Sequence, residues 1–368
     1  MGQKKLSTIW PIENHTLAKH EILKEYLNAW FPILGRTSDR IIFLDGFAGP
    51  GIYKEGEKGS PIIAIQTALE HQALKYIAEI RFAFIESDSK RSKILKEMID
   101  QEFPNLPSNV HVQVISGDFV ESLTETLDEI EEDGKNLAPT LAFLDPFGYS
   151  EIPFELITRI LHYPRCELFL TFMSGFVNRF LHDVEKENAV DGLYGTTKWR
   201  DARDIDDTDK RLDFLLELYV NQLNSIGIRF VRPFAMMTSG RRTIYDLIFA
   251  TKNWKGMDSM KKAMLKVVSN GTYTFSDKTD THQTYFVDYS EDSHWINDAS
   301  NSIFKQFNGK EIPLNEIRDF VLADTPFRFL KKVLVDMEKN GKIIDVSGRT
   351  RNALTYSDNC TVKFSKNT

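Results

Sequence analysis

The stretch RIIFLDGFAGPGIY, residues 40–53, joins a run of apolar residues to an acidic residue and three glycines. The apolar residues 41–44 have the length and composition of a buried β-strand. Asp45 ends this run, and the glycines after it permit backbone conformations that bring the chain close to a ligand. The stretch therefore predicts a strand that ends in a ligand-binding turn.

Predicted strands and helices alternate along the chain after this stretch. Strand-like segments lie at residues 81–88, 110–119, 140–148 and 166–173. Helical segments separate the strands at residues 61–80, 89–103, 120–133 and 153–163. This alternation predicts an α/β fold with a mostly parallel sheet and helices on both faces. Two more strand-like segments, 228–237 and 243–252, predict an antiparallel hairpin at the end of the sheet.

Two further regions are expected as additions to this fold. Residues 176–226 are polar and helical in character, which predicts a helical insertion within a first domain of residues 1–270. Residues 271–300 are expected to form a linker to a second domain.

The second domain, residues 301–368, has a different pattern. It contains two amphipathic helical segments followed by two short strands. The second helix is expected to begin at Thr325-Pro326 and to end at Gly341. Helices followed by a β-hairpin predict a winged-helix-like domain.

The composition restricts the class of protein. The 368 residues are 42% hydrophobic and 27% charged, an ordinary globular profile, and no apolar run reaches the roughly 18 residues of a membrane span. The two cysteines, Cys166 and Cys360, make neither a disulfide framework nor a zinc site, so we expect no metal and a cytoplasmic location. The net charge of −7 disfavours a uniformly basic surface but permits local basic patches.

A helical segment at residues 15–34 carries a polar extension of its apolar face. The extension consists of His15, Thr16, Lys19 and His20 at helical spacing. Polar residues on such a stripe indicate that this face leaves the core and lines a cleft.

Four acidic residues stand at the ends of four successive predicted strands: Asp45, Glu86, Asp118 and Asp145. Ligands of open α/β sheets bind outside the carboxyl ends of the strands, so we expect these side chains at one site. Glu86 has the position of a carboxylate that accepts both hydroxyls of a ribose, although acids at strand ends are common. Asp118 has the alternative role of N-cap for the helix that follows.

Together these features resemble the class I methyltransferases that use S-adenosylmethionine. The turn DGFAGPG resembles their first motif, and DPFG resembles the acceptor motif D-P-P-[YF] of amino-group methyltransferases. The segments NHTLAKHEIL and GSPIIA are similar to those of bacterial enzymes that methylate adenine N6 in 23S ribosomal RNA. DGFAGPG, GSPIIA and DPFG, in this order, resemble the three-Cys-motif partner (TcmP) family. That resemblance implies a Rossmann-like class I methyltransferase fold and a protein partner of the three-Cys-motif type.

The resemblance also implies two sets of site residues. The residues that would bind S-adenosylmethionine are Lys19, His20, Asp45, Gly46, Ala48, Gly49, Gly51, Ser60, Glu86, Asp118 and Phe119. The residues that would form the catalytic acceptor site are Asp145, Pro146, Phe147 and Tyr149. Two members have alternatives that stay open, since Lys19 is equally explained as a snorkelling surface lysine and His20 as a satisfied histidine of the core or rim.

The implied acceptor is an exocyclic amine of a nucleobase. The Asp145 carboxylate and the Pro146 carbonyl would accept its N–H bonds and aim its lone pair at the methyl group. Phe147 or Tyr149 would stack on the base. The chain departs from D-P-P-[YF] at Phe147 and Gly148, which leaves open a different acceptor or a loss of catalysis.

Basic side chains in the two predicted domains are candidates for contacts with nucleic-acid phosphates. They are Arg241, Arg242, Arg328, Lys331, Lys332 and Arg349. For the residues of the second domain, solvated charges or a protein-binding module are equally good explanations. For Arg241 and Arg242, a solvated hairpin tip is the preferred explanation.

Several functions therefore stand side by side. The favoured one is methyl transfer to a nucleobase amine, adenine N6 first, in RNA or DNA. The alternative is a catalytically altered partner protein that binds S-adenosylmethionine and works with another protein in nucleic-acid modification, repair or defence. A DNA-binding regulator would not need the acids at the strand ends, and a nicotinamide dehydrogenase would need the absent fingerprint G-x-G-x-x-G.

Overall fold

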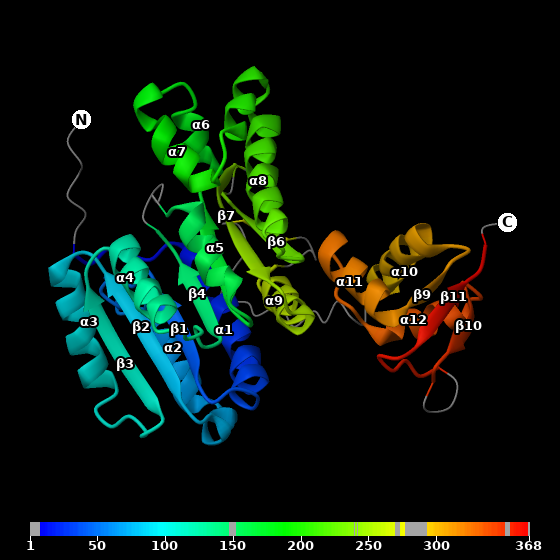
Figure 1. Cartoon of the computed structure of the whole chain (residues 1–368), viewed down its shortest axis with the longest axis horizontal. Coiled ribbons are helices and arrows are strands. Elements are labelled where there is room, and N and C mark those ends of the chain that lie inside the picture. The colour runs from blue at the N-terminus through cyan, green and yellow to red at the C-terminus, as the bar shows by residue number, and fades with distance from the viewer. Residues whose placement is uncertain are drawn as a thin grey trace. The chain divides into compact units, whose positions relative to one another are not determined.

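The computed structural model describes residues 8–146, 152–238, 240, 242–268, 273–276, 293–349 and 354–366. The chain divides into two compact units, which Figure 1 shows. The first is Met1–Val267 with Thr274–Gln283, and the second is Val268–Tyr273 with Thr284–Thr368. Among the helices of the described ranges, none combines the length and the hydropathy that a membrane crossing requires.

The first unit is built on one eight-stranded sheet. Its strands are β1 Ile41–Asp45, β2 Ile80–Glu86, β3 Val110–Ser116, β4 Thr140–Leu144, β5 Glu167–Phe172, β6 Phe230–Met237, β7 Thr243–Thr251 and β8 Thr274–Ser276. They lie in the order β3-β2-β1-β4-β5-β7-β6-β8. The first five are parallel neighbours, whereas β7 is antiparallel to both β5 and β6. The mostly parallel sheet and its antiparallel hairpin are thus confirmed.

Helices cover both faces of this sheet (Figure 1). They are α1 Asn14–Gly35, α2 Ser60–Glu70, α3 Ser89–Glu102, α4 Phe119–Glu132, α5 Phe154–His162 and α9 Trp254–Lys266. α1 packs on α2 and α9, while α4 packs on α5. Asp88 and Asp118 start α3 and α4, because each carboxylate accepts two backbone N–H groups of the first helical turn.

The helix expected at residues 61–80 is shorter than the sequence pattern indicated. α2 ends at Glu70, and His71 has extended dihedrals, φ −79° and ψ 128°. The imidazole Nδ1 of His71 accepts the N–H of Ala73 and starts a separate 3-10 turn, Gln72–Tyr76. A side chain that competes for a backbone donor therefore ends the helix early.

The helical segments expected between residues 176 and 226 surround a buried aromatic core. They are α6 Ser174–Arg179, two 3-10 turns at Val184–Lys186 and Lys198–Asp204, α7 Glu187–Tyr194 and α8 Thr208–Ser225. Tyr194, Trp199 and Tyr219 are almost fully buried, and the Tyr219 ring stacks on Phe172 of β5 at 4.5 Å. These contacts fix the helices to the face of the sheet that carries α5.

The second unit has its own core and a small antiparallel sheet. Its elements are α10 Ser293–Phe307, β9 Glu311–Pro313, α11 Leu314–Asp324, α12 Lys331–Lys339, β10 Ile343–Ser347 and β11 Thr361–Phe364. The sheet has the order β10-β11-β9, with both pairs antiparallel. Neither α10 nor β9 was expected from the sequence.

The start of α12 differs from the prediction. The helix begins at Lys331 rather than at Thr325-Pro326. The Thr325 hydroxyl donates to the carbonyl of Val321 at 2.6 Å and accepts the N–H of Phe327 at 3.1 Å. Thr325 therefore forms a local turn after α11 and does not cap a new helix.

Candidate active site at the carboxyl edge of the sheet

The strand order reverses at β1, which lies between β2 and β4. The chain proceeds from β1 outward to β3, then returns to β4 on the other side of β1. A crevice outside the carboxyl ends of the strands at such a point is where open α/β sheets bind ligands. Asp45 ends β1 and Asp145 follows β4, so two of the four predicted acids flank this point.

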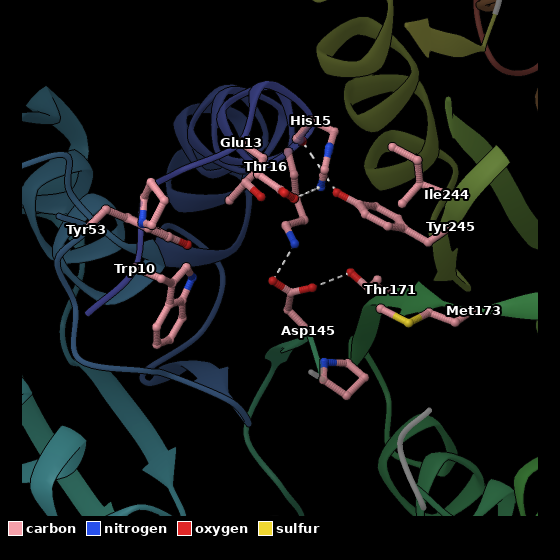
Figure 2. Close-up of a pocket in the computed structure, with 13 residues that line it drawn as sticks. Trp10, Glu13, His15, Thr16, Tyr53, Asp145, Thr171, Met173, Ile244 and Tyr245 are labelled. Atoms are coloured by element: carbon pink, nitrogen blue, oxygen red, sulfur yellow. Dashed lines mark hydrogen bonds and ion pairs between the residues drawn. The ribbon is translucent and has the colours of Figure 1, made fainter. Parts of the chain in front are cut away.

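Asp145 is held by two side chains from other elements. The Lys19 ammonium of α1 forms an ion pair with Oδ2, and the Thr171 hydroxyl of β5 donates to Oδ1 at 2.6 Å. Figure 2 shows Asp145 and Thr171 pointing toward one another, with Tyr245 on the same side as Thr171 and Trp10 opposite. Both carboxylate oxygens are thus oriented before any ligand arrives.

Asp45 is completely buried and has a different set of partners. The Ser60 hydroxyl at the start of α2 donates to Oδ2 at 2.6 Å, and the N–H of Phe47 donates to Oδ1 at 3.1 Å. Burial, with a smaller contribution from the nearby carboxylates of Asp145 and Glu86, raises the pKa of Asp45 to about 7, although the two hydrogen bonds lower it. Ser60 therefore contacts Asp45 directly.

Glu86 ends β2 and organises the glycine turn. Its Oε2 accepts the N–H of Gly49 at 2.8 Å, its Oε1 accepts the N–H of Asp88 at 2.8 Å, and Arg91 lies 3.9 Å away. Gly49 has φ +62° and Gly51 φ +75°, conformations that favour glycine. Glu86 therefore holds the glycine turn in place beside β1 through its hydrogen bond to Gly49.

Gly46 and Phe119 are brought together, whereas Asp118 is turned outward. A Cβ on Gly46 would lie 2.6 Å from the Phe119 ring and 2.8 Å from Leu144, so glycine is needed here for packing. Ala48 is buried and donates its N–H to Ile85. The exposed Asp118 carboxylate accepts the N–H groups of the first turn of α4, which matches the N-cap alternative.

Three of the four residues of the polar stripe of α1 line a cleft, as expected, whereas His20 does not. His15, Thr16 and Lys19 line a pocket, and His20 is buried behind them. His20 Nδ1 makes no hydrogen bond with any described residue. Burial and the neighbouring Lys19 ammonium lower the pKa of His20 to about 3, although Asp145 opposes the shift, so the imidazole is neutral.

The pocket has a volume of about 630 Å³, within the range of small-molecule sites. It is lined by Trp10, Pro11, Glu13, His15, Thr16, Lys19, Tyr53, Asp145, Pro146, Thr171, Met173, Ile244 and Tyr245. Trp10 and Tyr53 meet edge to face at 6.0 Å, and Tyr245 meets His15 at 5.4 Å. Flat side chains thus lie on two sides of a carboxylate and an ammonium (Figure 2).

Several of these residues were missed at the level of sequence. Thr171 could have been found, because it lies near the end of the predicted fifth strand. Trp10, Tyr53 and Tyr245 carry no such signal. Their positions depend on how the segments before α1 and after β1 pack, and on the pairing of β7 with β5. Of the predicted acceptor residues, Pro146 lines the pocket, whereas Phe147 and Tyr149 lie outside the described residues.

The predicted phosphate-binding residues are placed separately in the two units. Arg242 is exposed beside the hairpin, and Arg241 lies outside the described residues. Lys331 and Lys332 are exposed at the start of α12, and Arg328 is half-buried just before it. Arg349 is engaged within its own unit: it pairs with Glu338 at 2.5 Å and lies over the Tyr356 ring.

Comparison with known proteins finds distant similarity to solved structures and none by sequence. No protein-family model and no curated protein matches the sequence. Trm1 from Pyrococcus horikoshii, solved with S-adenosylmethionine, is 13% identical over 72% of this chain and 62% of that one, with a TM-score of 0.38. A class I S-adenosylmethionine-dependent methyltransferase of Listeria monocytogenes, itself described as putative, is 10% identical over 66% of this chain and 63% of that one, with a TM-score of 0.33. The DszA carbon methyltransferase is 13% identical over 58% of this chain and 48% of that one, with a TM-score of 0.30.

These similarities are distant, and the matched region spans less than two thirds of each of those three chains. They show distant structural similarity to class I S-adenosylmethionine-dependent methyltransferases and nothing narrower. The narrower resemblances, to the TcmP family and to the 23S ribosomal RNA enzymes, stay predictions.

Proposed function

We propose that the protein is an S-adenosylmethionine-dependent methyltransferase that acts on an exocyclic amino group of a nucleobase in RNA or DNA. The favoured acceptor is N6 of adenine. One observation carries this proposal. Asp145 lies at the carboxyl end of β4, beside the reversal point of the sheet, in a pocket with flat side chains on two sides. A carboxylate that can accept N–H bonds, beside aromatic rings that can stack, is complementary to the amino group of a planar base.

The chemistry of the neighbouring residues fits S-adenosylmethionine, whose sulfonium and ammonium groups are cationic. Asp45 and Glu86 are buried carboxylates, Asp45 lies near both Glu86 and Asp145, and burial raises the pKa of Asp45 to about 7. A cation beside these acids would stabilise their ionised forms. The Gly49 turn, bound to Glu86, lies at the strand end where an adenosine ribose would be held.

When bound, the cofactor supplies an electrophilic methyl group. The residues of this chain would hold and orient the acceptor. Asp145 and the Pro146 carbonyl would accept the N–H bonds of the amine, which leaves its lone pair directed along the transfer axis. Trp10 or Tyr245 would stack on the base, and a base within a duplex would have to be extruded first. The proton leaves the nitrogen after transfer, so no strong base is required.

The second unit would contribute to nucleic-acid binding. The arrangement of α10, α11 and α12 with a β10-β11-β9 sheet supports the winged-helix-like interpretation. The exposed Lys331 and Lys332 begin α12, the helix after α11, and would contact phosphates. Arg328 and Arg242 are further candidates of the same kind.

The test uses methyl-labelled S-adenosylmethionine, total RNA and total DNA. The expected result is label in one nucleic acid, recovered as an N-methylated nucleoside by mass spectrometry. In parallel, calorimetry measures cofactor binding to the wild-type protein and to Glu86→Ala, with the exposed Glu97→Ala as control. Absence of cofactor binding by the wild-type protein would refute the proposal.

A second candidate is a cofactor-binding partner protein without transferase activity. It is favoured by Asp145, whose two oxygens are already engaged by Lys19 and Thr171, and by the departure from D-P-P-[YF]. Such a protein would work with a three-Cys-motif protein in nucleic-acid modification, repair or defence. Cofactor binding without labelling of any nucleic acid, even with that partner added, would favour this candidate.

A further inference from the structure

Lys19 was expected to reach the cofactor or to close its pocket, and in the structure its ammonium pairs with the Asp145 carboxylate of the proposed acceptor site. We infer that Lys19 is a specificity-determining residue that donates a hydrogen bond to the ring nitrogen next to the amine held by Asp145. This inference rests on the proposed function, because it assumes that a nucleobase enters the pocket.

The Lys19 ammonium has hydrogen-bonding capacity to spare. It carries three N–H donors. One goes to Asp145 Oδ2, and within the described part of the chain no other acceptor is recorded for this nitrogen. The Lys19 side chain is only 5% exposed and lines the pocket, where its Nζ lies 5.3 Å from the centre of the Tyr245 ring. Buried donors without acceptors are unfavourable, so the pocket favours a ligand that supplies one.

The Asp145 carboxylate also keeps unused lone pairs. A carboxylate has about four acceptor sites, and Lys19 and Thr171 take one on each oxygen. An amine can therefore donate to Asp145 while both present partners stay in place. The two partners come from α1 and β5, so the carboxylate cannot rotate without breaking a contact.

The ion pair thus presents an acceptor and a donor next to each other, with no net charge. This is the complement of an amidine edge, in which an amino group adjoins a ring nitrogen with a free lone pair. The N6/N1 edge of adenine and the N4/N3 edge of cytosine are of this type. On the Watson–Crick edge of guanine the 2-amino group adjoins N1–H, a second donor that would face the Lys19 ammonium. Its other neighbour, N3, has a free lone pair but lies beside the glycosidic bond, where the ribose crowds the approach.

The pocket should therefore accept adenine- or cytosine-type edges and reject the 2-amino edge of guanine. Hydrogen bonds to charged groups are the stronger ones, and an unpaired buried donor is penalised. We expect discrimination on the order of 10- to 100-fold for loss of this one contact.

The experiment is a calorimetric titration of the full chain in the presence of S-adenosylhomocysteine. The probes are AMP, CMP, GMP and 1-deaza-AMP, in which a C–H replaces the ring nitrogen that Lys19 would read. AMP or CMP should bind at least about tenfold more tightly than GMP, and AMP more tightly than 1-deaza-AMP by the same factor. Comparison of AMP with CMP then tells which of the two bases the pocket prefers.

The variant Lys19→Met should bind AMP and 1-deaza-AMP equally, because it lacks the donor. Lys24→Met, on the exposed face of the same helix, should keep the wild-type preference. If Lys19→Met does not fold, the wild-type comparison of AMP with 1-deaza-AMP decides alone.

Four outcomes overturn the inference: equal binding of AMP and 1-deaza-AMP, tighter binding of GMP, no binding of any nucleotide, or a preference that survives in Lys19→Met. If one of these outcomes is found while S-adenosylhomocysteine binds, only the role of Lys19 is refuted, and the proposed methyltransferase function is not affected. If S-adenosylhomocysteine does not bind, the proposed function itself is refuted.

Discussion

Buried acids lie at both edges of the large sheet, and they differ in what surrounds them. At the carboxyl edge, the buried Asp45 and Glu86 end β1 and β2, and the half-buried Asp145 follows β4. At the amino edge, Glu167 begins β5 and is fully buried. Burial raises the pKa of Asp45 and of Glu167 alike, so burial and titration alone do not separate a ligand site from a core.

Glu167 and Asp145 differ in their hydrogen-bonding partners and in the free space beside them. Glu167 accepts the Tyr26 hydroxyl at 2.6 Å and the Thr251 hydroxyl at 2.7 Å. Helix α9 closes over it at Gly256, where even a methyl group would overlap with the carboxylate. Asp145, in contrast, lines a pocket of about 630 Å³ beside a lysine with spare donors. An acid with unused capacity next to empty volume indicates a site.

The largest effect is expected from Asp145→Asn. The amide keeps the size of the side chain but has no charge and only two acceptor sites, too few for the amine, Lys19 and Thr171 together, so methyl transfer should fall on the order of 100- to 1,000-fold. Cofactor affinity should change little, because Asp45 and Glu86 stay intact. Label transfer and calorimetry measure the two quantities, and the exposed Asp100→Asn is the matched control. Unchanged transfer in Asp145→Asn would remove Asp145 from the reaction.

The corresponding substitution at the amino edge of the sheet is Glu167→Ala. It leaves the hydroxyls of Tyr26 and Thr251 without their acceptor and opens a cavity, which should lower the free energy of unfolding by about 3 kcal/mol. Chemical denaturation checks this value, with the exposed Glu155→Ala as control. Cofactor affinity of the protein that remains folded should equal that of the wild type. A selective loss of cofactor binding would mean that the two edges are coupled.

The same contrast explains what could be predicted from the sequence. The strands and the acids at their ends follow from local patterns, and strand direction alone separates Asp45, at a carboxyl end, from Glu167, at an amino end. The partner of Asp145 could not be predicted, because Lys19 lies 126 residues away and meets it only through the packing of α1. Tyr245 depends on the register of the hairpin against β5. Local chemistry therefore located the site, while tertiary contacts determine what the site can hold.

A smaller effect is expected from Gly256→Ala, which tests how tightly the amino edge is closed. The new methyl group would overlap with the Glu167 carboxylate and contact the Tyr26 hydroxyl at 3.2 Å, so stability should fall by about 1–3 kcal/mol. Gly192→Ala in α7 is the control, because no atom lies within 4 Å of its Cβ position. This control should gain roughly 0.5–1 kcal/mol from helix propensity. Equal effects of the two substitutions would show that the contact at Glu167 carries no strain.

The smallest effect concerns the pH dependence of cofactor binding. The pKa of Asp45 is raised to about 7, so this carboxyl is largely protonated at pH 6 and ionised at pH 8. A cationic ligand prefers the ionised form, and the affinity for S-adenosylmethionine should therefore rise about tenfold between pH 6 and pH 8. His20, whose pKa is lowered to about 3, stays neutral throughout this range and does not contribute.

The control for the pH dependence of cofactor affinity is Asp45→Asn. In this variant, the cofactor's amino group and every residue other than Asp45 still titrate. The difference between the two profiles, measured by calorimetry at each pH, isolates Asp45. Stability of the ligand-free protein should show the opposite sign. Because the folded pKa lies above the ordinary value of 3.8, the contribution of Asp45 to stability is complete below that value and is lost as the pH rises toward 7. A wild-type affinity profile parallel to that of Asp45→Asn would place the cation away from Asp45, and Asp45 would then resemble Glu167 more than Asp145.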